Sequence, residues 1–337
     1  MIKDNNNLEI ILPKNQLRLF GYECYFNSFI SLFQKNKLPN AILLSGPEGS
    51  GKATFAYHFI NYLLSHNEKN EYSVENFTIN SDNKSYKNLL NNTHPNFLLL
   101  ENDRFGENIK IDDARKTLRF LEKTTYSSNT KIVLIDSADR LNVYSANALL
   151  KVLEEANNKT FFFIINNNSY KILNTIKSRC IEFKFFFTLS EKKKILNNII
   201  RKYMDDFDLT KIDECFYFAS PGNILKYLLI LNIRNIDLLK DKLSCILYLI
   251  ERYKQKNDPQ LLTFVSLLIE LFYNDLSIKN NKNLGLYFVN KFKLLKQIDN
   301  AKKLDVERFG NWKTEVLRLV SLTIGEFSQR FVVREVD

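Results

Sequence analysis

The chain has 337 residues, of which 45% are hydrophobic and 26% charged, a balance that is typical of a globular protein and excludes a disordered or collagen-like chain. At roughly 150 residues per domain, the length predicts two or three domains. The net charge of +10 permits contact with phosphate-rich partners without requiring it, because a solvated basic surface carries the same surplus.

The cysteines do not indicate a disulfide framework or a zinc site, because they lie far apart and form no CxxC pair. They are Cys24, Cys180, Cys215 and Cys245. The residues after Met1 include Lys3 and Asp4 and contain no apolar signal-peptide core. No stretch approaches the roughly 18 apolar residues that a membrane span needs. We therefore expect a soluble, cytoplasmic protein that makes no membrane contact.

Between about residues 26 and 185, apolar runs of strand length alternate with amphipathic stretches of helix length. This alternation predicts an α/β domain with a parallel sheet and flanking crossover helices. The expected strands are Ala41 to Ser45, Asn96 to Glu101, Lys131 to Asp136, Thr160 to Asn166 and Ile181 to Phe186. The expected helices are Phe55 to Leu64, Asp112 to Lys123, Ser145 to Glu155 and Tyr170 to Lys177.

After Phe187 only helical periodicity is seen. Thr188 and Glu191 have the spacing of a capping box, and Ser220, Pro221 and Gly222 interrupt the helical pattern. Beyond about residue 235 we expect four helix-length segments, with breaks near residues 257–259, 280–283 and 300–304. The apolar stripe of the last segment, from Val306 to Phe331, is typical of the core of a helical bundle.

A glycine-rich loop is the clearest chemical motif. Residues 46–52 read GPEGSGK, and they follow an expected strand and precede an expected helix. This is the GxxxxGK pattern, in which backbone N–H groups cradle phosphates and the lysine meets the β and γ oxygens. The nucleotide-binding candidates are Gly46, Gly49, Ser50, Gly51 and Lys52, together with Ala53 and Thr54 directly after the loop and Asp136 farther along the chain. The alternative is a structural turn that matches the pattern and binds nothing.

The groups that would hold a metal and activate water are incomplete. Ala53 stands where a Ser or Thr hydroxyl would hold Mg²⁺, and Thr54, one residue on, points about 100° away on a helix. Asp136 ends an apolar strand and is the candidate Mg²⁺-side carboxylate. Ser137 follows it where such ATPases commonly carry a glutamate, and a serine is a poor base. Asp139 is more plausibly structural than a substitute base.

Four segments resemble the clamp-loader branch of the AAA+ proteins. Lys131 to Glu155 is similar to the Walker B strand and the helix after it, and Lys177 to Cys180 matches the Ser-Arg-Cys motif. His94 to Glu101 and Ile111 to Tyr126 resemble more specifically the delta prime family of bacterial DNA polymerase III. The resemblance covers about residues 20–235, and beyond them only the layout is similar.

The resemblance implies a three-part subunit: an AAA+ domain over residues 1–187, a helical lid over 188–235 and a helical collar over 236–337 that holds five subunits in a ring. It also implies that Arg179, with Ser178 beside it, reaches the ATP site of a neighbouring subunit as an arginine finger. The implied partners are gamma/tau and delta subunits, the sliding clamp and, through the assembly, primed DNA. Arginine suits this role because its guanidinium stays charged and binds phosphate with planar donors.

Two departures separate this chain from the hydrolysing gamma/tau subunits. Those subunits typically carry a zinc-binding cysteine cluster, whereas Asn67 to Thr130 contains no cysteine, so we expect no zinc. They also carry a lid arginine that senses the γ-phosphate, whereas Asn223 follows the Ser-Pro-Gly here. The intact GxxxxGK leaves weak or non-hydrolysed binding of ATP with Mg²⁺ open.

Three functions follow from these observations. In the first, the chain is a clamp-loader subunit of the DNA polymerase III holoenzyme that lends Arg179 to its neighbour and has no ATPase activity of its own. In the second, it is a self-sufficient AAA+ ATPase of the gamma/tau type, against which Ala53, Ser137 and Asn223 argue together. In the third, it is a DNA-binding protein that depends mainly on its charge.

Overall fold

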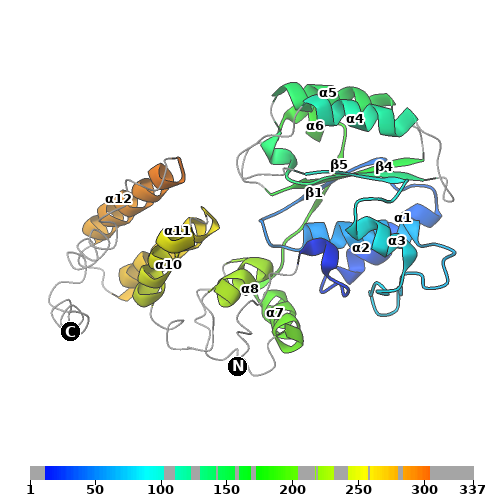
Figure 1. Cartoon of the computed structure of the whole chain (residues 1–337). Helices are drawn as coiled ribbons and strands as arrows, with labels where there is room; N and C mark the ends of the chain where they lie inside the picture. Colours follow the sequence, from blue (N-terminus) through cyan, green and yellow to red (C-terminus); the bar gives the residue numbers. More distant parts are fainter. Residues whose placement is uncertain are drawn as a thin grey trace. The chain divides into compact units, whose positions relative to one another are not determined.

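A five-stranded parallel sheet, seen in the computed structural model of Figure 1, forms the centre of the first part of the chain. Its strand order is β2-β3-β4-β1-β5, with every neighbouring pair parallel. The strands are β1 (Ala41–Ser45), β2 (Phe97–Leu100), β3 (Lys131–Ile135), β4 (Thr160–Asn166) and β5 (Ile181–Lys184). The predicted parallel sheet is confirmed. β2 is one residue shorter than expected at each end, and β3 and β5 end one and two residues earlier than expected.

The structure describes residues 12–101, 111–122, 130–141, 143–155, 159–167, 172–203, 217, 219–230, 242–256, 259–279 and 284–303. The chain divides into two compact units. The first comprises Met1–Phe207 and Tyr217–Lys226, and the second Asp208–Phe216 and Tyr227–Asp337. The division into parts at residues 187 and 235 stays a prediction.

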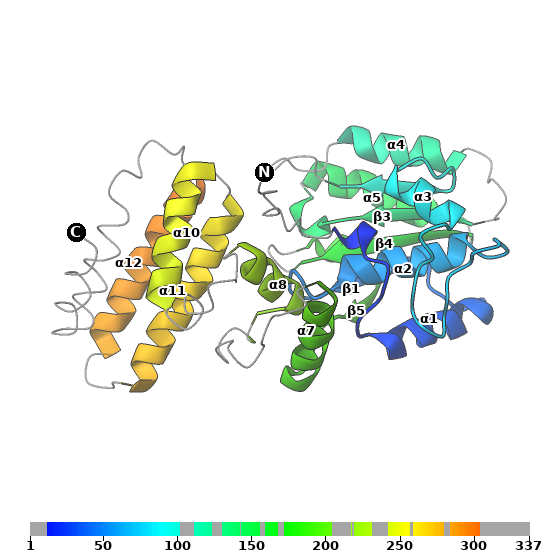
Figure 2. The same ribbon diagram turned by 60° about the horizontal axis from the view of Figure 1, so that its bottom comes forward.

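Helices cover both faces of the sheet (Figures 1 and 2). On one face lie α1 (Glu23–Gln34), α2 (Lys52–Leu64) and α3 (Lys84–Leu90), and on the other α4 (Ile111–Glu122), α5 (Val143–Glu155) and the short α6 (Asn174–Lys177). Two 3₁₀ turns, η1 (Pro13–Asn15) and η2 (Ala138–Arg140), complete the order. Because helices pack on both faces, β1, β3 and β4 are buried along their whole length, as expected for uninterrupted apolar runs.

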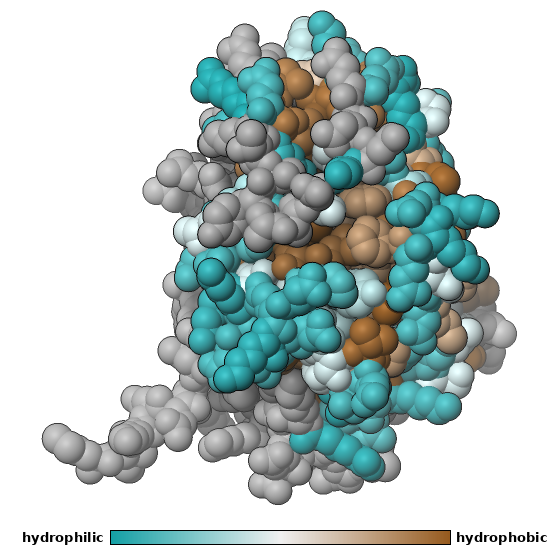
Figure 3. Space-filling view, turned by 90° about the vertical axis from the view of Figure 1, so that its right-hand side faces the viewer, coloured by the Kyte–Doolittle hydropathy of each residue, from teal (hydrophilic) through white to brown (hydrophobic). Residues whose placement is uncertain are grey.

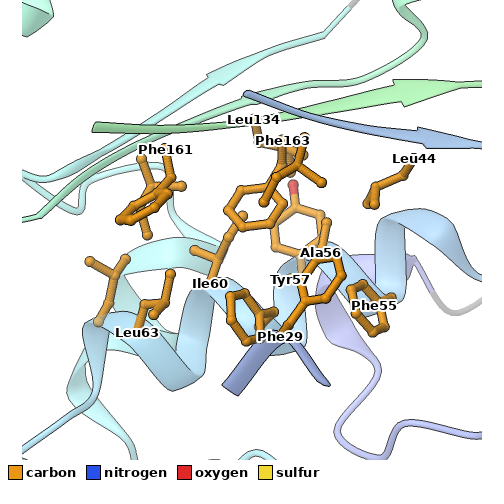
Figure 4. Packing of buried hydrophobic residues seen from close by; sticks show 14 of the residues in the cluster. Phe29, Leu44, Phe55, Ala56, Tyr57, Ile60, Leu63, Leu134, Phe161 and Phe163 are labelled. Atoms are coloured by element: carbon orange, nitrogen blue, oxygen red, sulfur yellow. The ribbon is translucent and has the colours of Figure 1, made fainter. Parts of the chain in front are cut away.

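The core between α1, α2 and the sheet is rich in aromatic rings (Figure 4). Phe29 is fully buried, and its ring centroid lies 5.2 Å from that of Phe55, 5.3 Å from Phe59 and 4.6 Å from Phe183. Such edge-to-face pairs add to the hydrophobic contribution of burial. The rings therefore fix α1 and α2 against β1 and its neighbours.

Two expectations about helices were wrong or incomplete. The helix expected over residues 170–177 begins only at Asn174, because Leu173 is extended and serves as the N-cap; residues 170 and 171 lie outside the described residues. The helix expected from Phe55 begins three residues earlier, at Lys52, directly after Gly51. Helices α1 and α3 were not predicted.

The capping box after the sheet is confirmed. The backbone N–H of Thr188 donates to Glu191 Oε2 at 2.7 Å, and the N–H of Glu191 donates to Thr188 Oγ1 at 3.3 Å. The pair starts α7 (Leu189–Tyr203), and α8 (Pro221–Ile230) begins at the predicted Ser-Pro-Gly interruption.

The second unit contains an antiparallel succession of long helices in its described residues. They are α10 (Lys242–Lys256), α11 (Pro259–Lys279) and α12 (Leu284–Lys303), with α10 packed on α11 and α11 on α12. The breaks expected near residues 257–259 and 280–283 fall between these helices, and α12 ends in the third. The fourth segment, from Val306 to Phe331, lies outside the described residues. Among the helices that the structure describes, none combines the length and apolarity needed to cross a bilayer.

Replacing Phe29 by Ala tests the aromatic core. The change removes a fully buried ring and should lower the free energy of unfolding by about 3–5 kcal/mol, since a cavity remains. Phe186→Ala is the matched control, because that ring is 66% exposed and its loss should cost less than about 0.5 kcal/mol. Denaturant titration of both variants measures the difference, and equal losses would contradict this packing.

Candidate functional site

The glycine-rich loop, residues 46–52, joins the carboxyl end of β1 to the first turn of α2. Gly49 and Gly51 have φ angles of +76° and +88°, which side chains rarely adopt. The loop is tied to β4 because the N–H of Gly46 donates to the carbonyl of Asn166 at 3.1 Å. This is the strand–loop–helix geometry in which backbone N–H groups at a helix N-terminus can receive an anion.

Lys52 is buried and bonds to the loop itself. The residue is only 2% exposed. Its Nζ donates to the carbonyls of Gly46 at 2.9 Å and Pro47 at 2.7 Å and to Ser50 Oγ at 3.4 Å. An ammonium has three N–H donors, and each has an acceptor here. The side chain of Lys52 therefore stabilises the conformation of the loop through hydrogen bonds to the loop itself.

Burial shifts the ionisation of the two charged groups at the site. Burial lowers the pKa of the Lys52 ammonium to about 8. The negative charges of the nearby Asp136, Glu48 and Asp139 act in the opposite direction and raise that pKa. Burial also raises the pKa of Asp136, although hydrogen bonds from Ser137 and the charge of Lys52 counteract the shift. The predicted candidates Gly46, Gly49, Ser50, Gly51, Lys52 and Asp136 thus lie at one edge of the sheet.

The metal side of the site offers few ligands. Ala53 packs against the aromatic core with a methyl group, and Thr54 is half-buried in the first turn of α2. The loop fits a phosphate, whereas Mg²⁺ would lack the hydroxyl that usually follows the lysine. Asp136 is the carboxylate at this edge that would face such an ion.

Ser137 replaces the expected base and is held in a small polar network. Its backbone is left-handed, with φ +60°. Its hydroxyl donates to Asp136 Oδ1 at 3.3 Å and accepts from Asn167 Nδ2 at 3.2 Å. Asp139 is 5% exposed and accepts the N–H of Asn167 at 3.2 Å, which supports the structural interpretation of this residue. The network orders the edge of the sheet and supplies no strong base.

The first turn of α8 lies directly on the loop. Ser220 Oγ donates to the carbonyl of Glu48 at 2.5 Å, and the N–H of Gly222 donates to the carbonyl of Gly49 at 2.9 Å. A Cβ on Gly49 would lie 2.7 Å from Asn223 Oδ1, so the uncharged Asn223 occupies the place next to the loop. On the loop side, the hydrogen bonds to the start of α8 are therefore accepted by backbone carbonyls.

Arg179 lies at the edge of the sheet formed by the amino ends of the strands, opposite the edge that carries the loop. It precedes β5, whose Ile181 pairs with Ile42 and whose Lys184 pairs with Ser45 of β1. Because β1 and β5 are parallel, their amino ends share one edge and their carboxyl ends the other. The four residues of β5 span roughly 13 Å. Arg179 is therefore separated from its own loop by more than the length of its side chain.

The guanidinium of Arg179 is exposed to solvent and is held in place by neighbouring polar groups. Its side chain is 36% exposed and forms an ion pair with Glu154 of α5. Its Nη1 donates to the carbonyl of Thr175 at 3.1 Å, and Ser178 Oγ donates to the same carbonyl at 3.0 Å. Ser178 thus ends α6 beside the arginine.

A cavity of about 770 Å³ lies away from the loop, between the ends of α1, α2 and α3. Seen from one side, apolar side chains are visible among the hydrophilic side chains of this part of the molecule (Figure 3). Ser85 Oγ lies 3.3 Å from His94 Nε2 there and donates to Glu68 Oε1 at 2.6 Å. His94 Nδ1 accepts the N–H of Asn96 at 3.2 Å. The proton of the neutral imidazole is therefore on Nε2, the nitrogen that faces Ser85. His94 therefore cannot serve as a base toward Ser85.

Sequence reasoning missed three contributors to these sites. Asn166 donates from Nδ2 to Ser45 Oγ at 3.3 Å beside the loop, and a polar residue at the end of a buried strand was the available signal. Gly222 was noted only as a helix breaker, although its contact with Gly49 needs the absence of a side chain. Glu154 carried no signal of its own, because its link to Arg179 joins two elements.

The sheet, the loop and the helical segments together define an α/β protein of the P-loop class. Residues 22–187 match the model of a family described as DNA polymerase III, delta subunit. The delta prime subunit of Pseudomonas aeruginosa is 34% identical over 143 residues, which cover 42% of each chain. That of Bacillus subtilis is 30% identical over 167 residues, 49% of this chain and 46% of its own. Residues 22–187 are thus similar to the delta prime family of DNA polymerase III subunits.

The gamma subunit is a further relative. That of Buchnera aphidicola from Schizaphis graminum is 27% identical over 233 residues, 67% of this chain and 61% of its own. The chain spans less than half the length of the Pseudomonas and Bacillus delta prime relatives. The residues that the family model matches, 22–187, contain the sheet, the loop and Arg179.

The lowered pKa of Lys52 predicts a pH dependence for any binding of phosphate by the loop. Below pH 8 the ammonium is charged and attracts phosphate, whereas above it the free protein must take up a proton to bind. The affinity for ATP should therefore fall about tenfold between pH 7 and pH 9. Calorimetric titration measures this change. Lys52→Ala should remove the dependence, and an affinity equal at both pH values would contradict the shifted pKa.

Gly222→Ala tests the contact between α8 and the loop. The new Cβ would lie 2.7 Å from the carbonyl oxygen of Gly49, so the backbone must move, and we expect a loss of about 1–3 kcal/mol in the free energy of unfolding. Gly285→Ala is the matched control, because a Cβ there meets nothing within 4 Å and Ala favours a helix. Thermal unfolding of both variants compares them; a neutral Gly222→Ala would refute the contact.

Proposed function

We propose that this chain is the delta prime subunit of a bacterial DNA polymerase III clamp loader and works in trans. In this role it lends Arg179 to the nucleotide site of a neighbouring gamma/tau subunit. Its other partners are a delta subunit, the sliding clamp and primed DNA, all reached in the cytoplasm through the assembly. The AAA+ domain, the lid and the collar correspond to residues 1–187, 188–235 and 236–337.

The location of Arg179 is the observation that carries this proposal. The arginine and the phosphate loop lie at opposite edges of the sheet, and β5 separates them. An exposed guanidinium that cannot reach its own loop is suited to the phosphates of another subunit, where its permanent charge and planar donors stabilise the transferring phosphoryl group. The similarity of residues 22–187 to the delta prime family supports the same assignment.

The chain's own site is proposed to bind ATP weakly and not to hydrolyse it. Ala53 offers no hydroxyl to a metal, Ser137 offers no strong base, and Asn223 offers no charge to a γ-phosphate. Bound ATP with Mg²⁺ would supply phosphates to the loop N–H groups and to Lys52. This chain's residues would position those phosphates, and no zinc is needed.

The second candidate is a self-sufficient ATPase of the gamma/tau type. Lys52 and Asp136 at one edge of the sheet favour it, as does the similarity to a gamma subunit. It predicts rapid ATP turnover by the isolated chain, which Lys52→Ala would abolish.

Arg179→Ala in a reconstituted loader tests the proposal. The variant should lower steady-state ATP hydrolysis in the presence of clamp and primed DNA by about tenfold or more. This is less than the 10³ to 10⁵ that a trans arginine contributes at its own site, and a loss of this size follows when the other sites of the ring turn over only together with that one. Arg201→Ala is the matched control, since it removes an exposed guanidinium from α7 and should leave the rate within about twofold. A full rate with Arg179→Ala, or brisk hydrolysis by the chain alone, would refute the trans role.

A further inference from the structure

The last turn of α5 lies beside the exposed arginine. Glu154 Oε1 accepts the N–H of Arg179 Nε at 2.6 Å and also pairs with Nη2. Nη1 donates to the carbonyl of Thr175 in α6 at 3.1 Å. Two helices that precede β5 in the chain thus hold all three nitrogens of one side chain.

These contacts leave part of the guanidinium available. A guanidinium has five N–H donors, and within the described part of the chain the contacts to Glu154 and Thr175 use one on each nitrogen. One N–H on each terminal nitrogen remains. Arginine commonly binds phosphate through its terminal N–H groups.

Stability does not account for the ion pair. The side chains of Arg179 and Glu154 are 36% and 52% exposed, and exposed pairs contribute little to folding. Without an acceptor, an arginine side chain at a surface samples many rotamers. The carboxylate also repels an approaching phosphate, but water and salt screen this repulsion. The larger effect of Glu154 is therefore on the orientation of the guanidinium.

We propose that Glu154 is a positioning residue for Arg179. It holds the Nε and Nη2 side of the guanidinium against α5, so that the two remaining N–H groups face a phosphate of the neighbouring subunit before that subunit binds. This inference rests on the proposed trans role of Arg179 and adds a residue to it. The carboxylate itself touches no phosphate.

The test compares Glu154→Ala and Glu154→Gln in the reconstituted loader. Glu154→Ala should lower kcat for ATP hydrolysis by about two- to fivefold, the factor expected from one exposed ion pair. KM for ATP should stay within about twofold, and Glu154→Gln, which keeps an acceptor oxygen, should recover part of the loss. Asp82→Asn is the matched control, because it breaks an exposed ion pair with Lys87 and should leave kcat unchanged.

Two further measurements separate this inference from the proposed function. The double variant Glu154→Ala/Arg179→Ala should be no slower than Arg179→Ala alone, because Glu154 acts through the arginine. In the free chain, the ¹⁵Nε signal of Arg179 should report a restrained side chain that becomes mobile in Glu154→Ala. A restrained arginine whose removal leaves the loader at full rate refutes the trans role. A slow Arg179→Ala loader with an unchanged or faster Glu154→Ala loader refutes the positioning role.

Discussion

The parallel pairing of β1 with β5 is the constraint on which the functional surface depends. It places the loop at the carboxyl edge of the sheet and Arg179 at the amino edge. Neither group can serve the other within one chain. The same two strands therefore present the glycine-rich loop and an exposed guanidinium on opposite edges. A ring of subunits can join such edges across each interface, which gives the arrangement a use that an isolated chain does not have.

The sequence predicted the parts of this arrangement that are written in local patterns. Apolar runs such as Thr160 to Asn166 gave the buried strands, because a strand covered on both faces needs no polar alternation. The glycines of the loop marked backbone conformations that side chains avoid. Thr188 and Glu191 marked a helix start through their own hydrogen bonds. Each of these signals depends on neighbours within a few residues.

The remaining features depend on contacts between distant segments. Ser220 meets the carbonyl of Glu48 across 172 positions of the chain, and a backbone carbonyl leaves no mark in the sequence. Glu154 and Arg179 are 25 positions apart and meet only because α5 and α6 pack together. Helix α1 was missed although Phe26, Phe29 and Phe33 have helical spacing, because they precede the first strand and were not assigned to the crossover pattern.

The loop also explains how a chain can carry GxxxxGK beside Ala53 and Ser137. Lys52 is buried, and its three donors are bonded to Gly46, Pro47 and Ser50. Removing it would leave two carbonyls and a hydroxyl without their donor, which carries a desolvation cost whether or not a nucleotide binds. Ala53 and Ser137 serve no such structural bond to the loop. Folding alone therefore favours the lysine and the glycines at these positions, whereas the loop places no such demand on residues 53 and 137, and this difference fits the proposed role of Arg179 in trans.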